Sequence, residues 1–264
     1  SNQNNVGMIK SSNLCCEIME FSNSKETAVC NLASLCLPSF IEDGSFNYDR
    51  LGEKVEELVY NLNMIIDRNH YPTEESRLSN MKHRPIGIGV QGLADVYMML
   101  NLPSTSKNAR QMNKNIFETI YYHSLKESNK LAQYHGVYES FGGSPTSQGI
   151  LQFDMWNVKP EYIKEENWDE LKSRILKSGL RNSLLVAPMP TASTAQIMGN
   201  NESFEPYTSN IYSRRVLAGE FVVINKHLVE KLKEENLFNK ETVDTIIYHR
   251  GSVKYTKLSD HSKE

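Results

Sequence analysis

We expect the fold to be organised around the stretch Ser11-Ser12-Asn13-Leu14-Cys15-Cys16-Glu17-Ile18-Met19. In an extended backbone alternate side chains point to the same face, so Asn13, Cys15 and Glu17 would share one face. That face would present an amide, a thiol and a carboxylate about 7 Å apart, a spacing that matches a sugar ring. The alternative is a half-buried strand whose cysteines only pack, because a free cysteine behaves as a small hydrophobic residue.

The composition is typical of a globular protein and excludes two classes of partner. The 264 residues are 39% hydrophobic and 23% charged, with a net charge of -3 and no lysine-rich run. This charge balance lacks the basic surface expected of a protein that binds nucleic acid. No apolar run approaches the roughly 18 residues of a membrane-spanning helix, and the first residues lack the pattern of a signal peptide. We therefore predict a cytoplasmic protein that binds neither nucleic acid nor a membrane.

The four cysteines lie at positions 15, 16, 30 and 36, without a C-x-x-C pair. This spacing fits neither a zinc site nor a disulfide framework, so we predict no metal site. Thiols clustered in a reducing compartment favour redox or radical chemistry, with plain burial as the alternative. The polar residues 21–27 can form a turn, so Cys15 and Cys30 are expected to meet on neighbouring strands.

Hydrophobic periodicity predicts an α/β fold. Apolar residues recur at helical spacing in some segments, and form short buried runs in others. The predicted helices span 48–68, 106–136, 160–178, 225–237 and 239–250, and the predicted strands span 28–37, 182–187 and 218–224.

Three glycines, Gly87, Gly89 and Gly92, match the dinucleotide-binding pattern G-x-G-x-x-G. No clear strand precedes them, and Pro103 lies near the position where an acidic residue should follow. We therefore reject a dinucleotide site and assign the glycines to close packing of a helix against its neighbours.

A second candidate site lies where the predicted strand 182–187 runs into Pro188 and a helix start. Three hydroxyl groups lie within four residues, on Thr191, Ser193 and Thr194. Free backbone N–H groups at the positive end of a helix dipole attract anions, so a phosphate would fit there. The alternative is an ordinary capped helix, because Ser and Thr are common caps.

Five segments together resemble the large catalytic subunit of class I, eukaryote-like ribonucleotide reductases. They occur in the family's order and cover nearly the whole chain, weakening after about Ile224. They are Ser-Ser-Asn-Leu-Cys-Cys-Glu-Ile at 11–18, Val-Cys-Asn-Leu-Ala-Ser at 29–34, His-Arg-Pro-Ile-Gly-Ile-Gly-Val-Gln-Gly-Leu-Ala-Asp at 83–95, Gly-Ile-Leu-Gln-Phe-Asp-Met-Trp at 149–156 and Arg-Asn-Ser-Leu-Leu-Val-Ala-Pro-Met-Pro-Thr-Ala-Ser-Thr-Ala at 181–195.

The resemblance implies part of a ten-stranded α/β barrel, made of two antiparallel half-barrels, with a finger loop that carries a radical cysteine. Residues 1–264 would then form a single domain, a partial catalytic barrel. Both ends look cut, so we expect the family's amino-terminal cone and half-barrel, and its carboxy-terminal tail, to lie outside the chain.

The resemblance also implies roles for individual residues. Cys15 would become a thiyl radical that abstracts the ribose 3′-hydrogen, Glu17 would act as the base on the 3′-hydroxyl, and Asn13 would bind the sugar hydroxyls. Cys30 would be one member of the dithiol that reduces the 2′ position, while Cys16 has no assigned role. The substrate phosphates would be held by Thr191, Ala192, Ser193 and Thr194.

The implied activity is the reduction of ribonucleoside diphosphates to 2′-deoxyribonucleoside diphosphates for DNA synthesis. The resemblance implies a metal-containing small subunit that generates the radical, and a reductant of the thioredoxin or glutaredoxin type, with no cofactor bound in this chain. It further implies complementary large-subunit segments, one of which carries the second reducing cysteine, and a homodimer of the full subunit.

Two alternatives remain. The chain would be a split or remnant piece that acts only with a complementary chain, or an enzyme in which Cys15 is a nucleophile and a histidine its base. None of the seven histidines is placed near Cys15 by the sequence, which disfavours the second alternative.

Overall fold

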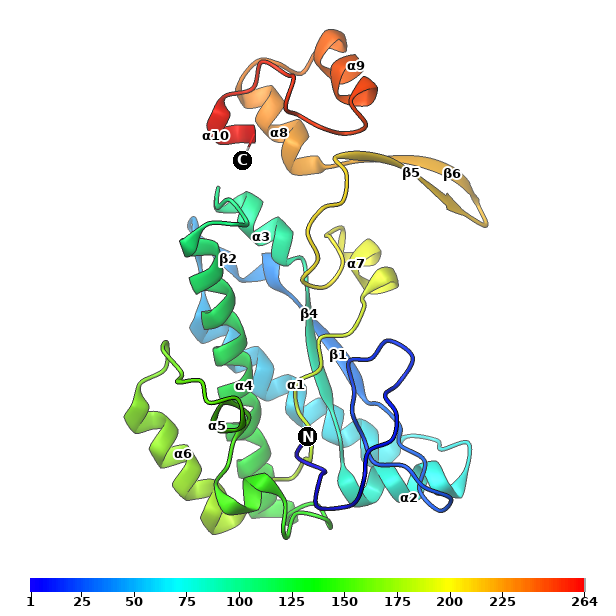
Figure 1. Cartoon of the computed structure of the whole chain (residues 1–264), viewed down its shortest axis with the longest axis vertical. Coiled ribbons are helices and arrows are strands. Elements are labelled where there is room, and N and C mark those ends of the chain that lie inside the picture. The colour runs from blue at the N-terminus through cyan, green and yellow to red at the C-terminus, as the bar shows by residue number, and fades with distance from the viewer. Residues whose placement is uncertain (264) are drawn as a thin grey trace.

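Three parallel extended segments form the centre of the fold in the computed structural model, which describes residues 1–263 (Figure 1). Strand β1 (Leu32–Cys36) pairs in parallel with β4 (Gly87–Gln91), and Ile88 of β4 forms a parallel bridge with Val186. Because the three segments run in the same direction, their amino ends meet at one edge and their carboxyl ends at the opposite edge.

Long helices cover one side of these segments. Helix α1 (Tyr48–Arg68) packs against α4 (Lys107–His135), and α6 (Glu165–Ser178) packs against α4. The predicted bounds of α1 are confirmed, and α4 begins after the cap residue Ser106, whose side chain accepts a hydrogen bond from the Ala109 N–H. The apolar faces that predicted these helices form the main core together with β1 and β4.

Shorter elements connect these layers. They are η1 (Leu37–Phe40), β2 (Ile41–Glu42), β3 (Ser45–Phe46), α2 (Glu74–His83), α3 (Leu93–Met99), η2 (Pro145–Gln148), α5 (Gln152–Met155) and α7 (Ala192–Met198).

The carboxy-terminal part contains an antiparallel hairpin and three helices with a small apolar cluster of their own (Figure 1). The elements are β5 (Ile211–Val216), β6 (Gly219–Ile224), α8 (Lys226–Glu234), α9 (Lys240–Tyr248) and α10 (Asp260–Lys263).

The prediction that residues 11–19 form an extended strand is wrong. They form the tip of a long loop, which we call the finger loop and define as residues 11–20. The Cys16 N–H donates to the Asn13 carbonyl (3.2 Å), the Ile18 N–H donates to Asn13 Oδ1 (3.0 Å), and Cys16 has a left-handed φ of +64°. These local bonds close a turn, so Asn13, Cys15 and Glu17 do not lie along one strand face.

Other boundaries also differ from the predictions. Strand β1 begins at Leu32, so Cys15 and Cys30 both lie in irregular segments and not on neighbouring strands. Residues 182–187 contribute one bridge, at Val186, and α6 begins at Glu165 because residues 160–164 are not helical.

The glycine motif provides close packing, but in a strand instead of a helix. A Cβ on Gly87 would lie 2.5 Å from Leu32 Cδ2 and 2.9 Å from Ala187 Cβ. A Cβ on Gly89 would lie 2.7 Å from Met189 Sδ. Only the third glycine, Gly92, precedes a helix, as the cap of α3 with a φ of +78°.

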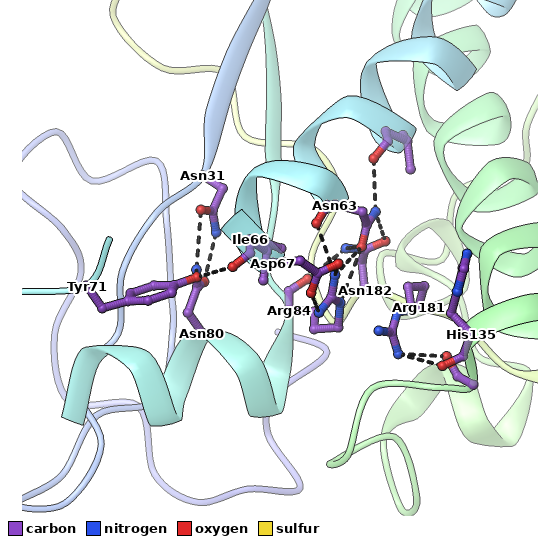
Figure 2. Close-up of polar contacts among 12 residues, drawn as sticks. Asn31, Asn63, Ile66, Asp67, Tyr71, Asn80, Arg84, His135, Arg181 and Asn182 are labelled. Carbon is purple, nitrogen blue, oxygen red and sulfur yellow. Dashed lines mark hydrogen bonds and ion pairs between the residues drawn. The ribbon is translucent and has the colours of Figure 1, made fainter. Parts of the chain in front are cut away.

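A buried polar belt joins the segments that lead into the three central strands (Figure 2). Asn31 directly precedes β1, Arg84 lies shortly before β4, and Asn182 lies shortly before Val186; all three are buried. We define the belt as these three residues, their side-chain partners Asn63, Asp67 and Asn80, and Tyr71, which contacts Asn80.

Within the described residues, no helix is both long and apolar enough to cross a lipid bilayer.

Gly89→Ala should lower the free energy of unfolding by about 1 to 3 kcal/mol, the usual cost of overpacking, because the new methyl group would press on Met189 and lie 3.1 Å from the Ala187 carbonyl oxygen. Denaturant unfolding measures this change. The matched control is Gly142→Ala, whose Cβ would meet nothing within 4 Å and which should be nearly neutral. Equal stability of the two variants would contradict the packing described for β4.

Candidate active site

The finger loop presents its two cysteines to solvent and is anchored by an apolar residue. Cys15 and Cys16 are exposed, and Leu14 between Asn13 and Cys15 is 97% exposed. Ile18 is buried, and its Cδ1 lies 3.9 Å from the position of a Cβ on Gly87. The loop therefore rests on β4 through Ile18 while its tip stays accessible.

Glu17 combines partial exposure with one buried oxygen. Its Oε2 is buried and has no hydrogen-bond partner among residues 1–263. An unpaired buried acceptor costs free energy, so this oxygen suits a ligand that donates a hydrogen bond. The oxygen of the Asn13 side chain is already used to hold the Ile18 N–H.

Cys30 lies close enough to the finger loop for charges to interact. Although Cys30 is exposed, partial desolvation of its thiol, together with the charges of Glu20, Glu17 and Cys15, raises its pKa to about 11. At neutral pH the Cys30 thiol is therefore protonated. The prediction that Cys15 and Cys30 meet on neighbouring strands is wrong, because both residues lie in irregular segments.

Glu20 is a buried carboxyl group that the sequence patterns did not single out. Burial raises its pKa to about 8, so it is largely neutral at pH 7. A glutamate three residues after Glu17 gives no signal of its own in the sequence. Only the fold of the finger loop turns it inward.

The segment between the finger loop and β1 is fixed to helix α2. Glu26 accepts a hydrogen bond from Lys82 (2.6 Å) and lies 2.7 Å from His83 Nε2. Burial would raise the pKa of Glu26, but hydrogen bonds from Lys82 and His83 lower it below its ordinary value. Asn31, the residue after Cys30, also contacts α2, through Asn80 (2.8 Å).

The turn before α7 holds the second group of predicted site residues. Thr191 is buried, and its Oγ1 accepts a hydrogen bond from the Ser203 N–H (2.7 Å), so this hydroxyl oxygen has a structural partner. No side chain caps α7, and the first N–H groups of a helix have no partner inside it. Ala192, Ser193 and Thr194 are exposed.

Both groups of site residues are placed against the same face of β4. Gly87 and Gly89 are two residues apart in a strand, so they share one face. Ile18 of the finger loop and Ala187 approach Gly87 from that face, and Met189 approaches Gly89. The finger loop and the segment that leads into α7 are therefore brought together by β4.

The segment after α7 is held by Asp95, which the sequence patterns also missed. Asp95 is fully buried and accepts hydrogen bonds from the Asn201 N–H (2.7 Å), the Tyr207 hydroxyl (2.8 Å) and His227 Nε2 (2.8 Å). Burial would raise the pKa of Asp95, but the bonds from His227, Asn201 and Tyr207 lower it. This carboxylate joins α3 to α8 and to the return from α7.

Across residues 1–263, no group of three or more His, Cys, Asp or Glu side chains is arranged to hold a metal ion.

Comparisons with known proteins agree on one family. The model of the ribonucleotide reductase barrel domain matches residues 1–264. The large subunit of ribonucleoside-diphosphate reductase from Plasmodium falciparum is 57% identical over 267 residues, which cover 100% of this chain and 33% of that protein. The large subunit from Monkeypox virus is 56% identical over 263 residues, covering 100% of this chain and 34% of that protein.

A solved structure supports the same assignment. The alpha subunit of the class Id ribonucleotide reductase from Actinobacillus ureae superposes with a TM-score of 0.73 at 26% identity, covering 99% of this chain and 42% of that chain. The chain spans about a third of the length of the curated relatives it matches. It belongs to the ribonucleotide reductase family, as an α/β portion of the barrel domain of the large subunit.

Proposed function

We propose that this chain supplies Asn13, Cys15, Glu17 and Cys30 to the active site of a ribonucleoside-diphosphate reductase. The observation that carries the proposal is the buried, unpaired Oε2 of Glu17, which lies in the same cluster as two thiols. A ribose hydroxyl is the donor that this oxygen would accept, and a thiol beside it is the group that exchanges a hydrogen atom with carbon.

In the proposed reaction Cys15, as a thiyl radical, takes the hydrogen atom from C3′ while Glu17 accepts the proton of the 3′-hydroxyl. The C2′–O bond breaks, and the hydroxyl group leaves with a proton as water. Cys30 and a second thiol supply two electrons and become a disulfide, and Cys15 returns a hydrogen atom to C3′. The balance is one C–O bond replaced by C–H, two thiols oxidised to a disulfide and one water formed.

The raised pKa of Cys30 supports its part in this scheme. A thiol whose pKa is about 11 keeps its proton at neutral pH, so it can give a proton together with its electrons. Asn13 would bind the sugar hydroxyls through its amide nitrogen, because its oxygen holds the finger loop.

The substrate diphosphate would bind at the turn formed by Thr191, Ala192, Ser193 and Thr194. Uncapped N–H groups and an exposed Ser193 hydroxyl at the start of α7 favour an anion. Thr191 contributes through its backbone position, because its Oγ1 already accepts a bond from Ser203.

The proposal includes the partners that the family requires. A metal-containing small subunit would supply the radical, and a reductant of the thioredoxin or glutaredoxin type would restore the dithiol. Residues 1–264 would act as one domain, a part of the catalytic barrel, with further large-subunit segments and a second copy of the full subunit. All four cysteines are free thiols, which suits a reducing compartment such as the cytoplasm.

A second candidate is a catalytically incomplete piece that works only with a complementary chain. The share of the relatives' length that this chain covers, about a third, favours it. Turnover by the chain with its small subunit alone, without any other large-subunit segment, would exclude this candidate.

Cys15→Ser, in an intact large subunit with its small subunit, should reduce turnover to background without unfolding the protein. An O–H bond is too strong for the hydrogen-atom exchange that a thiol supports. Cys16→Ser is the matched control, because Cys16 is an exposed neighbour with a left-handed backbone, and it should keep most activity. Deoxyribonucleotide formation measures both, and equal loss from the two variants would refute the assignment.

Ser193→Ala should weaken binding of a nucleoside diphosphate by about 1 to 2 kcal/mol, the scale of a hydrogen bond to a charged group. Isothermal titration of the reconstituted enzyme measures the affinity. Ser173→Ala on α6 removes a hydroxyl that donates to the Asp169 carbonyl and should change nothing. An unchanged affinity for Ser193→Ala would exclude its hydroxyl from the phosphate site.

Glu20→Gln should lower the pKa of Cys30, because a neighbouring negative charge disfavours the thiolate and its removal favours it. Between about pH 9 and 11 the variant should therefore react faster with iodoacetamide at Cys30. Peptide mapping measures the rate at each cysteine. Glu161→Gln, at an exposed ion pair with Lys114, should leave the pH dependence of the Cys30 reaction unchanged. The same shift in both variants would contradict the effect of Glu20 on Cys30.

A further inference from the structure

Cys30 lies just outside the strand ladder, so something other than β1 must fix its position. Its thiol makes no hydrogen bond within the described part of the chain, and β1 begins two residues later, at Leu32. The residue between them, Asn31, is 6% exposed. Its carbonyl accepts a hydrogen bond from the Gly87 N–H (2.9 Å), and its Nδ2 donates to the Pro85 carbonyl (2.8 Å).

A chain of hydrogen bonds, buried at its start, leads from Asn31 to helix α1 (Figure 2). Asn31 Nδ2 donates to Asn80 Oδ1 (2.8 Å), and Asn80 Nδ2 donates to Asn31 Oδ1 (3.3 Å), so the two amides form a reciprocal pair of hydrogen bonds. Asn80 Nδ2 also donates to the Tyr71 hydroxyl (2.6 Å), and that hydroxyl donates to the Ile66 carbonyl (2.7 Å).

Each link of this chain is directional; the links between Asn31 and Asn80 are buried, and those of the Tyr71 hydroxyl are partly buried. Asn80 is fully buried, and its amide has partners on both sides. A buried amide that loses its partner keeps the full cost of desolvation, so alternative orientations are disfavoured. The side chain of Asn31, and with it the peptide that joins Asn31 to Cys30, is therefore held in one place by α1, α2 and the segment before β4.

Two cysteines that act as a reducing dithiol have to be placed accurately relative to each other. Two cysteines form a disulfide only within a narrow range of Cα separations, roughly 4.4 to 6.8 Å, and of Cβ directions. A shift of about 1 Å at Cys30 would therefore slow disulfide formation, although it would leave Cys15, on a separate loop, in place.

We propose that Asn80 and Tyr71 are positioning residues for Cys30, holding its thiol where it can form a disulfide and reach the sugar. The proposal rests on the reducing role proposed for Cys30. Asn80 and Tyr71 themselves touch neither substrate nor thiol; they act through Asn31.

The test compares two steps of the reaction in the intact large subunit with its small subunit. Release of tritium from 3′-labelled substrate into water, by exchange at the Cys15 thiol before the hydrogen atom is returned, reports the step assigned to Cys15. Formation of the deoxy product in a single turnover reports the step assigned to Cys30. Asn80→Leu should slow product formation about tenfold, on the scale of one lost buried hydrogen bond, and change tritium loss less than about twofold. Tyr71→Phe removes the hydrogen bonds from Asn80 and to the Ile66 carbonyl but keeps the Asn31–Asn80 pair, so it should show the same split with a smaller effect.

A redox titration gives a second readout that depends only on the thiol. Displacing Cys30 should disfavour the disulfide about tenfold, which raises its reduction potential by about 30 mV. Mass spectrometry of Cys30 peptides, after equilibration in dithiothreitol buffers, measures the potential.

Two variants control for loss of stability alone. Asn129→Leu removes another fully buried amide, which lies on α4 and donates to the carbonyl of Gly179 (2.8 Å), the residue that ends α6. Tyr97→Phe removes a hydroxyl that donates to the Ala109 carbonyl (3.2 Å). Neither should change the ratio of the two rates or the potential of Cys30.

Equal slowing of tritium loss and product formation in Asn80→Leu and Tyr71→Phe, with an unchanged potential, would overturn the proposal. The same outcome for Asn129→Leu as for Asn80→Leu would overturn it as well. Failure of the proposed function would be seen separately, as an unmodified enzyme that forms no Cys30 disulfide during turnover.

Discussion

The fold depends on one ion pair, between the buried Arg84 and Asp67, whose side chain is 37% exposed to solvent. Arg84 is almost fully buried, and its guanidinium donates to both carboxylate oxygens of Asp67 (2.6 and 3.0 Å) and to the Asn63 carbonyl (3.1 Å). Removing Asp67 would leave the buried Arg84 guanidinium without its counter-ion, at a cost that solvent contact of the carboxylate makes smaller than in a fully buried pair. Because Arg84 ends α2 and leads into β4, this pair fixes where the central strand begins.

The polar belt extends that constraint to the other two parallel segments. Asn182 donates to the Arg84 carbonyl (2.8 Å) and to Asn63 Oδ1 (3.1 Å), which ties the segment before Val186 to the same point. Asn31 is tied through the Pro85 carbonyl (2.8 Å). Parallel strands lack a short hairpin to set their register, so a shared anchor at their amino ends performs that task. Cys30 and the turn before α7 are continuous with these segments, so the same anchor helps to fix their positions.

The sequence predicted the parts of the fold whose hydrophobic pattern is strong, such as α1 and α4, and it predicted the candidate site residues through the family resemblance. It did not predict α2, because the buried face of that helix carries Ser76, Ser79, Asn80 and His83 in place of apolar residues. The finger loop differs from the predicted strand because an alternating pattern of side chains does not reveal the turn that the Asn13 side chain closes. Glu20 and Asp95 gave no signal, since nothing in their local sequence shows that a carboxylate will be buried.

The two halves of the proposed chemistry call for different supports, and the structure provides them. Cys15 sits on a loop without a strand partner, anchored by Ile18 on Gly87, so its tip can adapt to a radical-transfer partner and a substrate. In the proposed reaction Cys30 would have to meet a second thiol within a narrow geometry, and it lies directly beside Asn31 of the polar belt. The backbone near Cys15 is held by an apolar contact, which is not directional and leaves the loop adaptable. The backbone near Cys30 is held by hydrogen bonds, which depend on direction as well as distance and keep it rigid.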